Sequence, residues 1–107
     1  MNAYVGVFTA RLETPWVTSL KEKRAVIRPV MERIKARFPV SAARVAGLDE
    51  HGWEQVGFSV IGGDAAWVAE VLDAVERFLR SSGEYRVVVL TREIIVFDGT
   101  VSPEPPG

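Results

Sequence analysis

Basic side chains repeat at helical spacing in one segment of this chain, and they are the residues best suited to bind an anion. Four of them fall within about 60° of one another on a helical wheel, namely Lys21, Arg24, Arg28 and Lys35. Residues 19–38 hold seven basic and two acidic side chains, a local charge of +5 in a chain whose formal net charge is −1. A cluster of positive charge in a chain that is nearly neutral overall favours a defined interface over indiscriminate nucleic-acid binding. The hypothesis is that these four residues, the basic flank, bind RNA or the ribosome.

The same residues also have a purely structural interpretation. Arg24 and Arg28 stand at positions i and i+4, where like charges cost about 0.2–0.5 kcal/mol. Glu32 is spaced to pair with both Arg28 and Lys35 and so to offset part of that cost. Under this alternative, the basic flank is a solvated helix face whose long side chains cover the edges of an apolar stripe.

Groups that could perform catalysis are scarce. The chain has no cysteine and a single histidine, His51, which lies in a turn next to Gly52 and is interpreted as a surface residue. A metal site formed by His51 with Asp49 and Glu50 is the alternative, and local carboxylates alone would make it weak. Ser19 has a capping role and no evident base. We therefore expect no catalytic residues, no metal, no cofactor and no small-molecule substrate, and hence a protein that is not an enzyme.

Two glycine-containing segments have to be weighed as ligand sites. Gly57-Phe58-Ser59-Val60 matches part of an RNA-recognition strand signature, which needs aromatic rings on an open sheet face. Alternation places Phe58 on the face that we expect beneath the helices, so the match is interpreted as accidental. Gly62-Gly63 could direct backbone N–H groups at a phosphate. Because Asp64 would put a carboxylate where that anion should sit, a tight turn is predicted instead.

The helix that carries the basic flank has a well-marked start. Ser19 and Glu22 have the S-x-x-E spacing of a capping box, in which the serine oxygen accepts the N–H of Glu22 and the carboxylate reaches back to the N–H of Ser19. The apolar spacing then predicts one amphipathic helix from about Leu20 to Phe38. Pro29 removes the hydrogen bond to the carbonyl of Ala25 and predicts a kink.

The remaining segments alternate between strand and helix patterns. Strands are predicted at residues 3–12, 40–48, 53–61 and 85–97, and a second helix runs from the cap at Asp64 to a stop at Gly83. The β-α-β-β-α-β order predicts an α+β, ferredoxin-like fold with a four-stranded antiparallel sheet and two helices on one face. The other face stays open and has to be covered by water-tolerant residues, another subunit or a ligand.

A family resemblance adds to this interpretation. Ser19–Arg24 (SLKEKR) comes directly after the first strand, and the basic helix ends in Arg37-Phe38, followed by Val40-Ser41 and Trp53-Glu54-Gln55. This combination resembles the YlxP-like bacterial family, catalogued as domain of unknown function 503, over roughly residues 4–97. The resemblance implies a small ferredoxin-like bacterial cytoplasmic protein, whose genes often lie among those for transcription and translation factors. It implies no catalytic residues.

Domain organisation and compartment follow from the composition. Residues 1–100 are predicted to form a single domain, and the proline-rich residues 101–107 a disordered tail. No apolar run approaches the roughly 20 residues that span a bilayer, so we expect no membrane role. The N-terminal residues lack a basic n-region, which favours the cytoplasm. The scarcity of side-chain amides and the arginine bias favour a thermophile source, although a GC-rich genome would produce the same bias.

An apolar run predicts self-association. Val87–Leu90 is continuously apolar in a strand that the topology places at a sheet edge, where two helices can cover only one face. A homodimer that buries this strand or the open sheet face is therefore expected. The alternative function is accordingly a structural or regulatory homo-oligomer with no nucleic-acid role.

Overall fold

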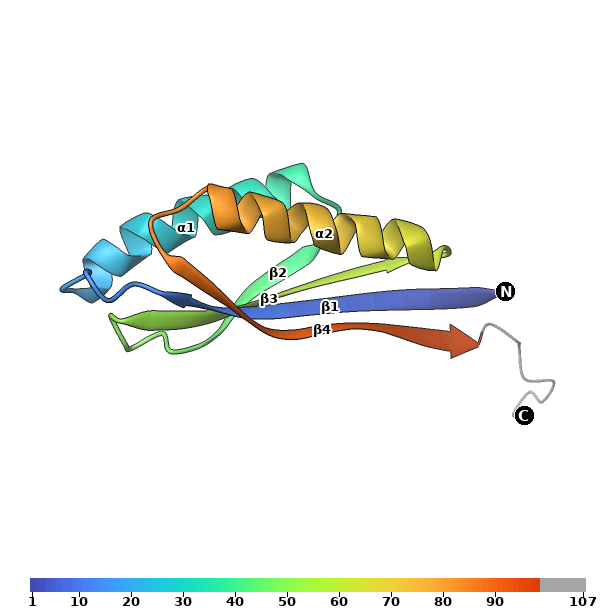
Figure 1. Cartoon of the computed structure of the whole chain (residues 1–107), viewed down its shortest axis with the longest axis horizontal. Coiled ribbons are helices and arrows are strands. Elements are labelled where there is room, and N and C mark those ends of the chain that lie inside the picture. Colours follow the sequence, from blue (N-terminus) through green and yellow to red (C-terminus); the bar gives the residue numbers. More distant parts are fainter. Residues whose placement is uncertain (99–107) are drawn as a thin grey trace, which may run out of the picture.

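The computed structural model describes residues 1–98 and consists of one sheet covered by two helices (Figure 1). The elements in chain order are β1 Asn2–Glu13, α1 Leu20–Arg37, β2 Ser41–Ala46, β3 Trp53–Gly62, α2 Ala65–Ser81 and β4 Arg86–Asp98. The strands form an antiparallel sheet of order β2-β3-β1-β4. The predicted ferredoxin-like α+β fold is confirmed. The predicted tail, residues 101–107, lies outside the described residues.

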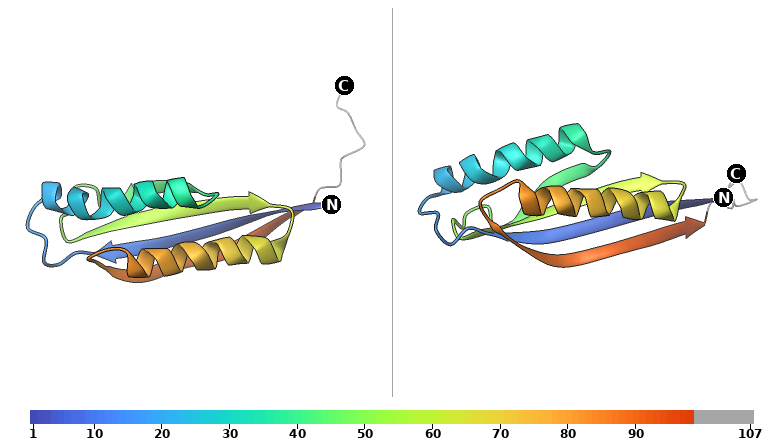
Figure 2. Two further views of the ribbon diagram at one scale, coloured as in Figure 1. Left: turned by 90° about the horizontal axis from the view of Figure 1, so that it is seen from above. Right: turned by 45° about the horizontal axis from the view of Figure 1, so that its top comes forward.

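Both helices lie on the same face of the sheet and leave the other face open (Figure 2). The central strands β1 and β3 pair without interruption from Tyr4 opposite Gly62 to Glu13 opposite Trp53. A Cβ atom at Gly6 would lie only 2.7 Å from a methyl carbon of Val68, so α2 packs directly against the backbone of β1 there.

The core fills the space between this face and the helices. The β3 side chains Val56, Phe58 and Val60 are buried, as the alternation predicts. The Phe58 ring stacks on Phe8 of β1 with the centroids 6.0 Å apart, which confirms that Phe58 lies beneath the helices. The helices contribute the other large set of buried apolar residues: Ile27, Val30, Met31 and Ile34 of α1, and Val68, Val71, Leu72, Val75 and Leu79 of α2.

The start of α1 follows the prediction in one respect and departs from it in another. Ser19 is the cap, and its Oγ accepts the N–H of Glu22 at 3.1 Å. The prediction that the Glu22 carboxylate accepts a hydrogen bond from the N–H of Ser19 is wrong. The Glu22 carboxylate accepts instead from the N–H of Thr18 at 2.7 Å and from its hydroxyl at 3.2 Å, because Thr18 offers two donors. The helix then continues through Pro29 to Arg37, so it is a single helix, as expected.

The hairpin β2–β3 is shorter than predicted on its first strand. β2 begins at Ser41 and ends at Ala46, where the predicted strand spans residues 40–48. The strand ends because Gly47 has a positive φ of 75°, which leads the chain into the turn. The Trp53 ring closes over this glycine and would lie within 2.6 Å of a Cβ atom there.

The strand β4 lies at the edge of the sheet and contains a β-bulge. Thr9 pairs with Thr91 and Ala10 with Val89, so Leu90 is the extra residue on β4. The bulge divides β4 into two segments, Arg86–Val89 and Thr91–Asp98.

Among the described residues, no helix is long and apolar enough to cross a membrane.

Candidate nucleic-acid interface

The basic flank forms one continuous exposed surface along α1. Lys21, Arg24 and Arg28 border a shallow depression of about 460 Å³ whose remaining lining is Ala25 and Pro29. None of these three cations has a hydrogen-bond or ion-pair partner among the described residues. Their positive charge is therefore not neutralised by this part of the protein.

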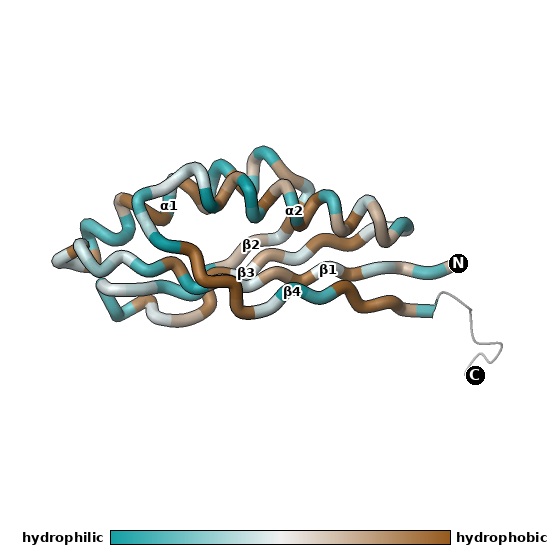
Figure 3. The backbone as a smooth tube through the Cα atoms, in the orientation of Figure 1, coloured by the Kyte–Doolittle hydropathy of each residue, from teal (hydrophilic) through white to brown (hydrophobic). Residues whose placement is uncertain are grey.

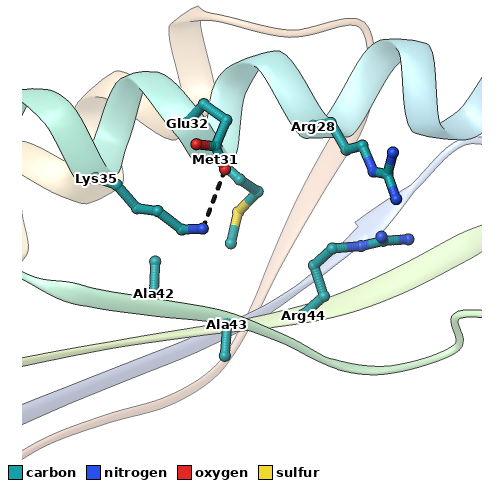
Figure 4. A pocket seen from close by; sticks show the side chains of 7 residues that line it. All are labelled: Arg28, Met31, Glu32, Lys35, Ala42, Ala43 and Arg44. Carbon is teal, nitrogen blue, oxygen red and sulfur yellow. Dashed lines mark hydrogen bonds and ion pairs between the residues drawn. The ribbon is translucent and has the colours of Figure 1, made fainter.

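A groove between α1 and β2 continues this surface (Figure 4). It has a volume of about 460 Å³ and is lined by Arg28, Met31, Glu32 and Lys35 of α1 and by Ala42, Ala43 and Arg44 of β2. Arg28 belongs to both the depression and the groove, so the four predicted residues are indeed brought together. In Figure 4 the side chains of Arg28 and Arg44 extend toward the same end of the groove.

One acidic residue, Glu32, lies among the described residues that line the groove. The Lys35 ammonium lies 3.0 Å from a carboxylate oxygen of Glu32. Of the two ion pairs expected for Glu32, this one forms, whereas the structure contains no pair with Arg28. Lys35 is thus a partly neutralised member of the basic flank, and Arg28 is a fully available one.

Arg44 is a cation that the sequence interpretation did not include. Its Nε and Nη2 atoms donate to the two oxygens of Glu54, the second bond measuring 2.8 Å. The Nη1 group has no partner among the described residues. A bidentate contact of this kind fixes the plane of the guanidinium, so Arg44 presents its remaining donor from a defined position beside the groove.

The charge state of this pair is set by its hydrogen bonds. Burial by itself would raise the pKa of Glu54, but the hydrogen bonds from Arg44 and Lys23 outweigh it and lower the pKa below its ordinary value. The hydrogen bond to Glu54 raises the pKa of Arg44. Both groups are therefore ionised at neutral pH, and Arg44 remains a cation in the groove.

Lys23 has a structural role although it lies inside the basic SLKEKR segment. Its side chain is fully buried, and its ammonium lies 3.0 Å from Glu54. It also donates to the carbonyls of Gly47 at 2.7 Å, Glu50, and Trp53 at 3.3 Å. These contacts fasten α1 to the β2–β3 turn and set the position of the basic flank above β2.

A signal for this buried pair exists in the sequence. On the helical wheel Lys23 falls between Val30 and Ile34, inside the apolar stripe rather than beside it. Glu54 likewise shares the alternation that buries Val56. Two residues of opposite charge at core positions predict a buried ion pair, because burying an isolated charge costs too much folding free energy.

His51 contributes to the turn through its ring and its backbone carbonyl. Its Nδ1 lies 3.1 Å from the carbonyl oxygen of Val17, and its own carbonyl accepts from the Thr14 hydroxyl at 2.8 Å. The part of the chain that the structure describes has no group of three or more His, Cys, Asp or Glu side chains placed to hold a metal ion.

The Gly62-Gly63 segment leads into α2 in the way that was predicted. The Asp64 carboxylate caps the helix by accepting the N–H of Trp67 at 3.2 Å. An anionic side chain thus occupies the helix N-terminus, where a phosphate would have to bind.

The sequence pattern of one family, described as "Protein of unknown function (DUF503)", matches residues 5–92. No curated protein matches the chain. The match covers nearly the whole described part and includes every residue of the basic flank.

Proposed function

Since the chain belongs to the DUF503 family of proteins of unknown function, its role has to be argued from its own surface, and we propose that it binds RNA, as a non-enzymatic accessory factor of the ribosome in the bacterial cytoplasm. The binding surface is the basic flank, Lys21, Arg24, Arg28 and Lys35, joined in the groove by Arg44. Identification with the YlxP-like members is part of the same proposal.

One observation carries the proposal. Lys21, Arg24 and Arg28 are exposed and unpaired among the described residues, in a chain whose formal net charge is −1. An uncompensated arginine pair one helical turn apart lowers helix stability slightly. A feature that costs stability and gathers positive charge is best explained by an anionic partner.

The shape of the surface favours single-stranded RNA. Arginine presents several donors to phosphate oxygens, and the cations here follow one helix rather than surrounding a closed cavity. The apolar lining from Met31, Ala42 and Ala43 offers contact area for unstacked bases or riboses between the cations. A backbone that follows the groove would meet Arg28 and Arg44 on its two sides.

Binding to a fluorescein-labelled single-stranded oligo(U) and sedimentation with ribosomal subunits test the proposal. Four phosphate contacts, by Lys21, Arg24, Arg28 and Arg44, should give a slope of roughly −3 when log affinity is plotted against log salt, at about −0.7 per phosphate. The double variant Arg24→Glu/Arg28→Glu should lose both binding and sedimentation. Absence of wild-type binding at low salt, or unchanged binding by this variant, would return the basic flank to an ordinary solvated surface.

A matched variant separates local recognition from total charge. Arg33→Glu/Arg77→Glu makes the same change in net charge at two exposed positions that have no partner among the described residues and lie off the basic flank. It should bind nearly as the wild type does. An acidic protein partner is a different outcome, in which salt would mainly slow association.

A further inference from the structure

The end of β4 has apolar side chains that the helices and the neighbouring strand leave partly exposed. The exposed fractions are 39% for Ile94, 43% for Ile95, 56% for Val96 and 54% for Phe97. Figure 3 shows this stretch in brown, separated from the earlier apolar run of β4 by hydrophilic residues. The predicted contact run Val87–Leu90 is less suitable than this one, because Val87 and Val88 are already half-buried.

These side chains are exposed on both faces of the sheet. Ile95 pairs with Val5, whose other neighbour, Ile61, is 66% exposed on the open face. Ile94 pairs with Gly6, which lies under α2, so Ile94 and Val96 point to the helix side. A partner stacked on the open face would cover only half of this set. A partner that continues the sheet would cover both halves.

The edge of β4 is suited to strand pairing after the bulge. Residues 91–98 pair regularly with β1, whereas the bulge at Leu90 interrupts the edge before them. An unprotected apolar edge strand invites pairing with another chain.

The exposed apolar area supplies a substantial part of what an interface needs. The exposed surface of Ile94–Phe97 is on the order of 350 Å², within the 300–600 Å² of the largest apolar patch on a typical monomer. A standard interface buries about 800 Å² per partner. Paired backbone and flanking polar groups would supply the remainder.

We propose that a second copy of this chain adds its β4 antiparallel to β4, so that the two sheets become one continuous sheet. A twofold axis perpendicular to the sheet keeps both pairs of helices on the same side. Each residue must then pair with one that points to the same face, which restricts the register to a few choices.

Apolar pairing and the avoidance of like charges favour one register. With the axis at Ile95, this residue faces its own copy, Ile94 faces Val96, and Glu93 faces Phe97. Arg92, which pairs with Asp73 of α2 at 2.7 Å in its own chain, lies opposite Asp98. Moving the axis to Glu93 would set two like charges against each other. Moving it to Ile94 would set Arg92 opposite Val96 of the second copy. The register at Ile95 therefore pairs Ile94, Ile95 and Val96 with apolar residues of the second copy and sets no like charges against each other.

This dimer does not use the proposed RNA surface. β2 is the strand farthest from β4, so the groove beside it lies at the outer end of each sheet. The two proposals can consequently fail separately.

Solution mass is the first test. Light scattering on the full chain at tens of micromolar should give twice the 11.8 kDa of the monomer. Ile95→Lys should give the monomer with an unchanged far-UV spectrum. Val45→Lys places the same charge at an exposed apolar position on the other edge strand and should remain a dimer. A monomeric wild type, or a dimeric Ile95→Lys variant, would overturn the proposal.

Cross-linking tests the register without relying on a disruptive substitution. The chain has no cysteine, so single variants give unambiguous disulfides. Directly opposed antiparallel residues have Cα atoms about 4.5–5.5 Å apart, within the range that a disulfide spans. Ile95→Cys should form a covalent dimer on mild oxidation, whereas Ile61→Cys, two strands farther from the axis in each copy, should not. Cross-linking at Ile61→Cys, or none at Ile95→Cys, would contradict strand pairing in this register.

Discussion

The ammonium of Lys23 lies 3.0 Å from a carboxylate oxygen of Glu54, and both side chains are fully buried. The pair joins α1 to β3, and the further bonds of Lys23 to the carbonyls of Gly47 and Trp53 hold the hairpin turn against the helix. The orientation of the exposed basic flank thus depends on one basic residue that is not exposed. The SLKEKR segment therefore has two distinct functions, anchoring through Lys23 and presenting charge through Lys21 and Arg24.

Removing the buried ammonium should destabilise the protein strongly. Lys23→Met leaves the Glu54 carboxylate with Arg44 alone and several turn carbonyls without their donor, and breaking a buried pair costs about 3–5 kcal/mol. Urea unfolding should show that the free energy of unfolding falls by an amount at the lower end of that range, because Arg44 still pairs with Glu54. Arg24→Met, an exposed position one residue along, should stay within about 0.5 kcal/mol. Equal losses in the two variants would disprove the anchoring role.

The lowered pKa of Glu54 predicts a defined pH dependence. Because the carboxylate binds its proton less tightly in the folded chain, the unfolded chain holds more protons between the two pKa values, and the free energy of unfolding rises with pH there. This contribution is present above the ordinary glutamate pKa and is lost as pH falls through the lower folded value. Urea unfolding from neutral to acid pH should show the stability gap between wild type and Glu54→Gln narrowing in acid. A gap that is constant with pH would contradict this assignment.

The sequence was sufficient for the fold because its local signals agree with one another. The cap at Ser19, the alternation around Phe58 and the cap at Asp64 each mark an element that the structure contains. One feature of the candidate site and one of the sheet edge depended on tertiary structure. Arg44 joins the groove only because β2 lies beside α1, and the bulge at Leu90 is visible only in the pairing with β1. No local pattern encodes either contact.

In the turn that Lys23 binds, an alanine substitution should destabilise the protein at Gly47 but not at Gly52. Gly47 has a φ of +75°, and a Cβ atom there would approach the Trp53 ring to 2.6 Å. The left-handed conformation alone costs a non-glycine residue roughly 1–2 kcal/mol. Gly47→Ala should therefore lower the midpoint of thermal unfolding clearly. Gly52→Ala, in the same hairpin but with no atom within 4 Å of the new methyl group, should leave the midpoint nearly unchanged. Comparable shifts would mean that the turn is not fixed as described.

Glu32 provides a test in which binding should improve. Its carboxylate lies 3.0 Å from the Lys35 ammonium and is the one acidic group lining the groove between α1 and β2. If phosphates occupy that groove, Glu32 both repels them and neutralises one of their ligands. Glu32→Gln should therefore tighten binding to single-stranded oligo(U), and one additional phosphate contact by Lys35 would make the log–log salt slope steeper by about 0.7.

A control for the gain at Glu32 lies on the other helix. Glu70→Gln removes the same charge from an exposed position of α2, far from the groove lining, and should leave the affinity and the salt slope unchanged. Equal gains in the two variants would mean that net charge alone governs binding. Weaker binding by Glu32→Gln would point to a partner that presents cations to this surface. Tighter binding by Glu32→Gln but not by Glu70→Gln, without loss of thermal stability, requires an anion in the groove. On a helix face that is only solvated, the two substitutions would have the same effect on binding.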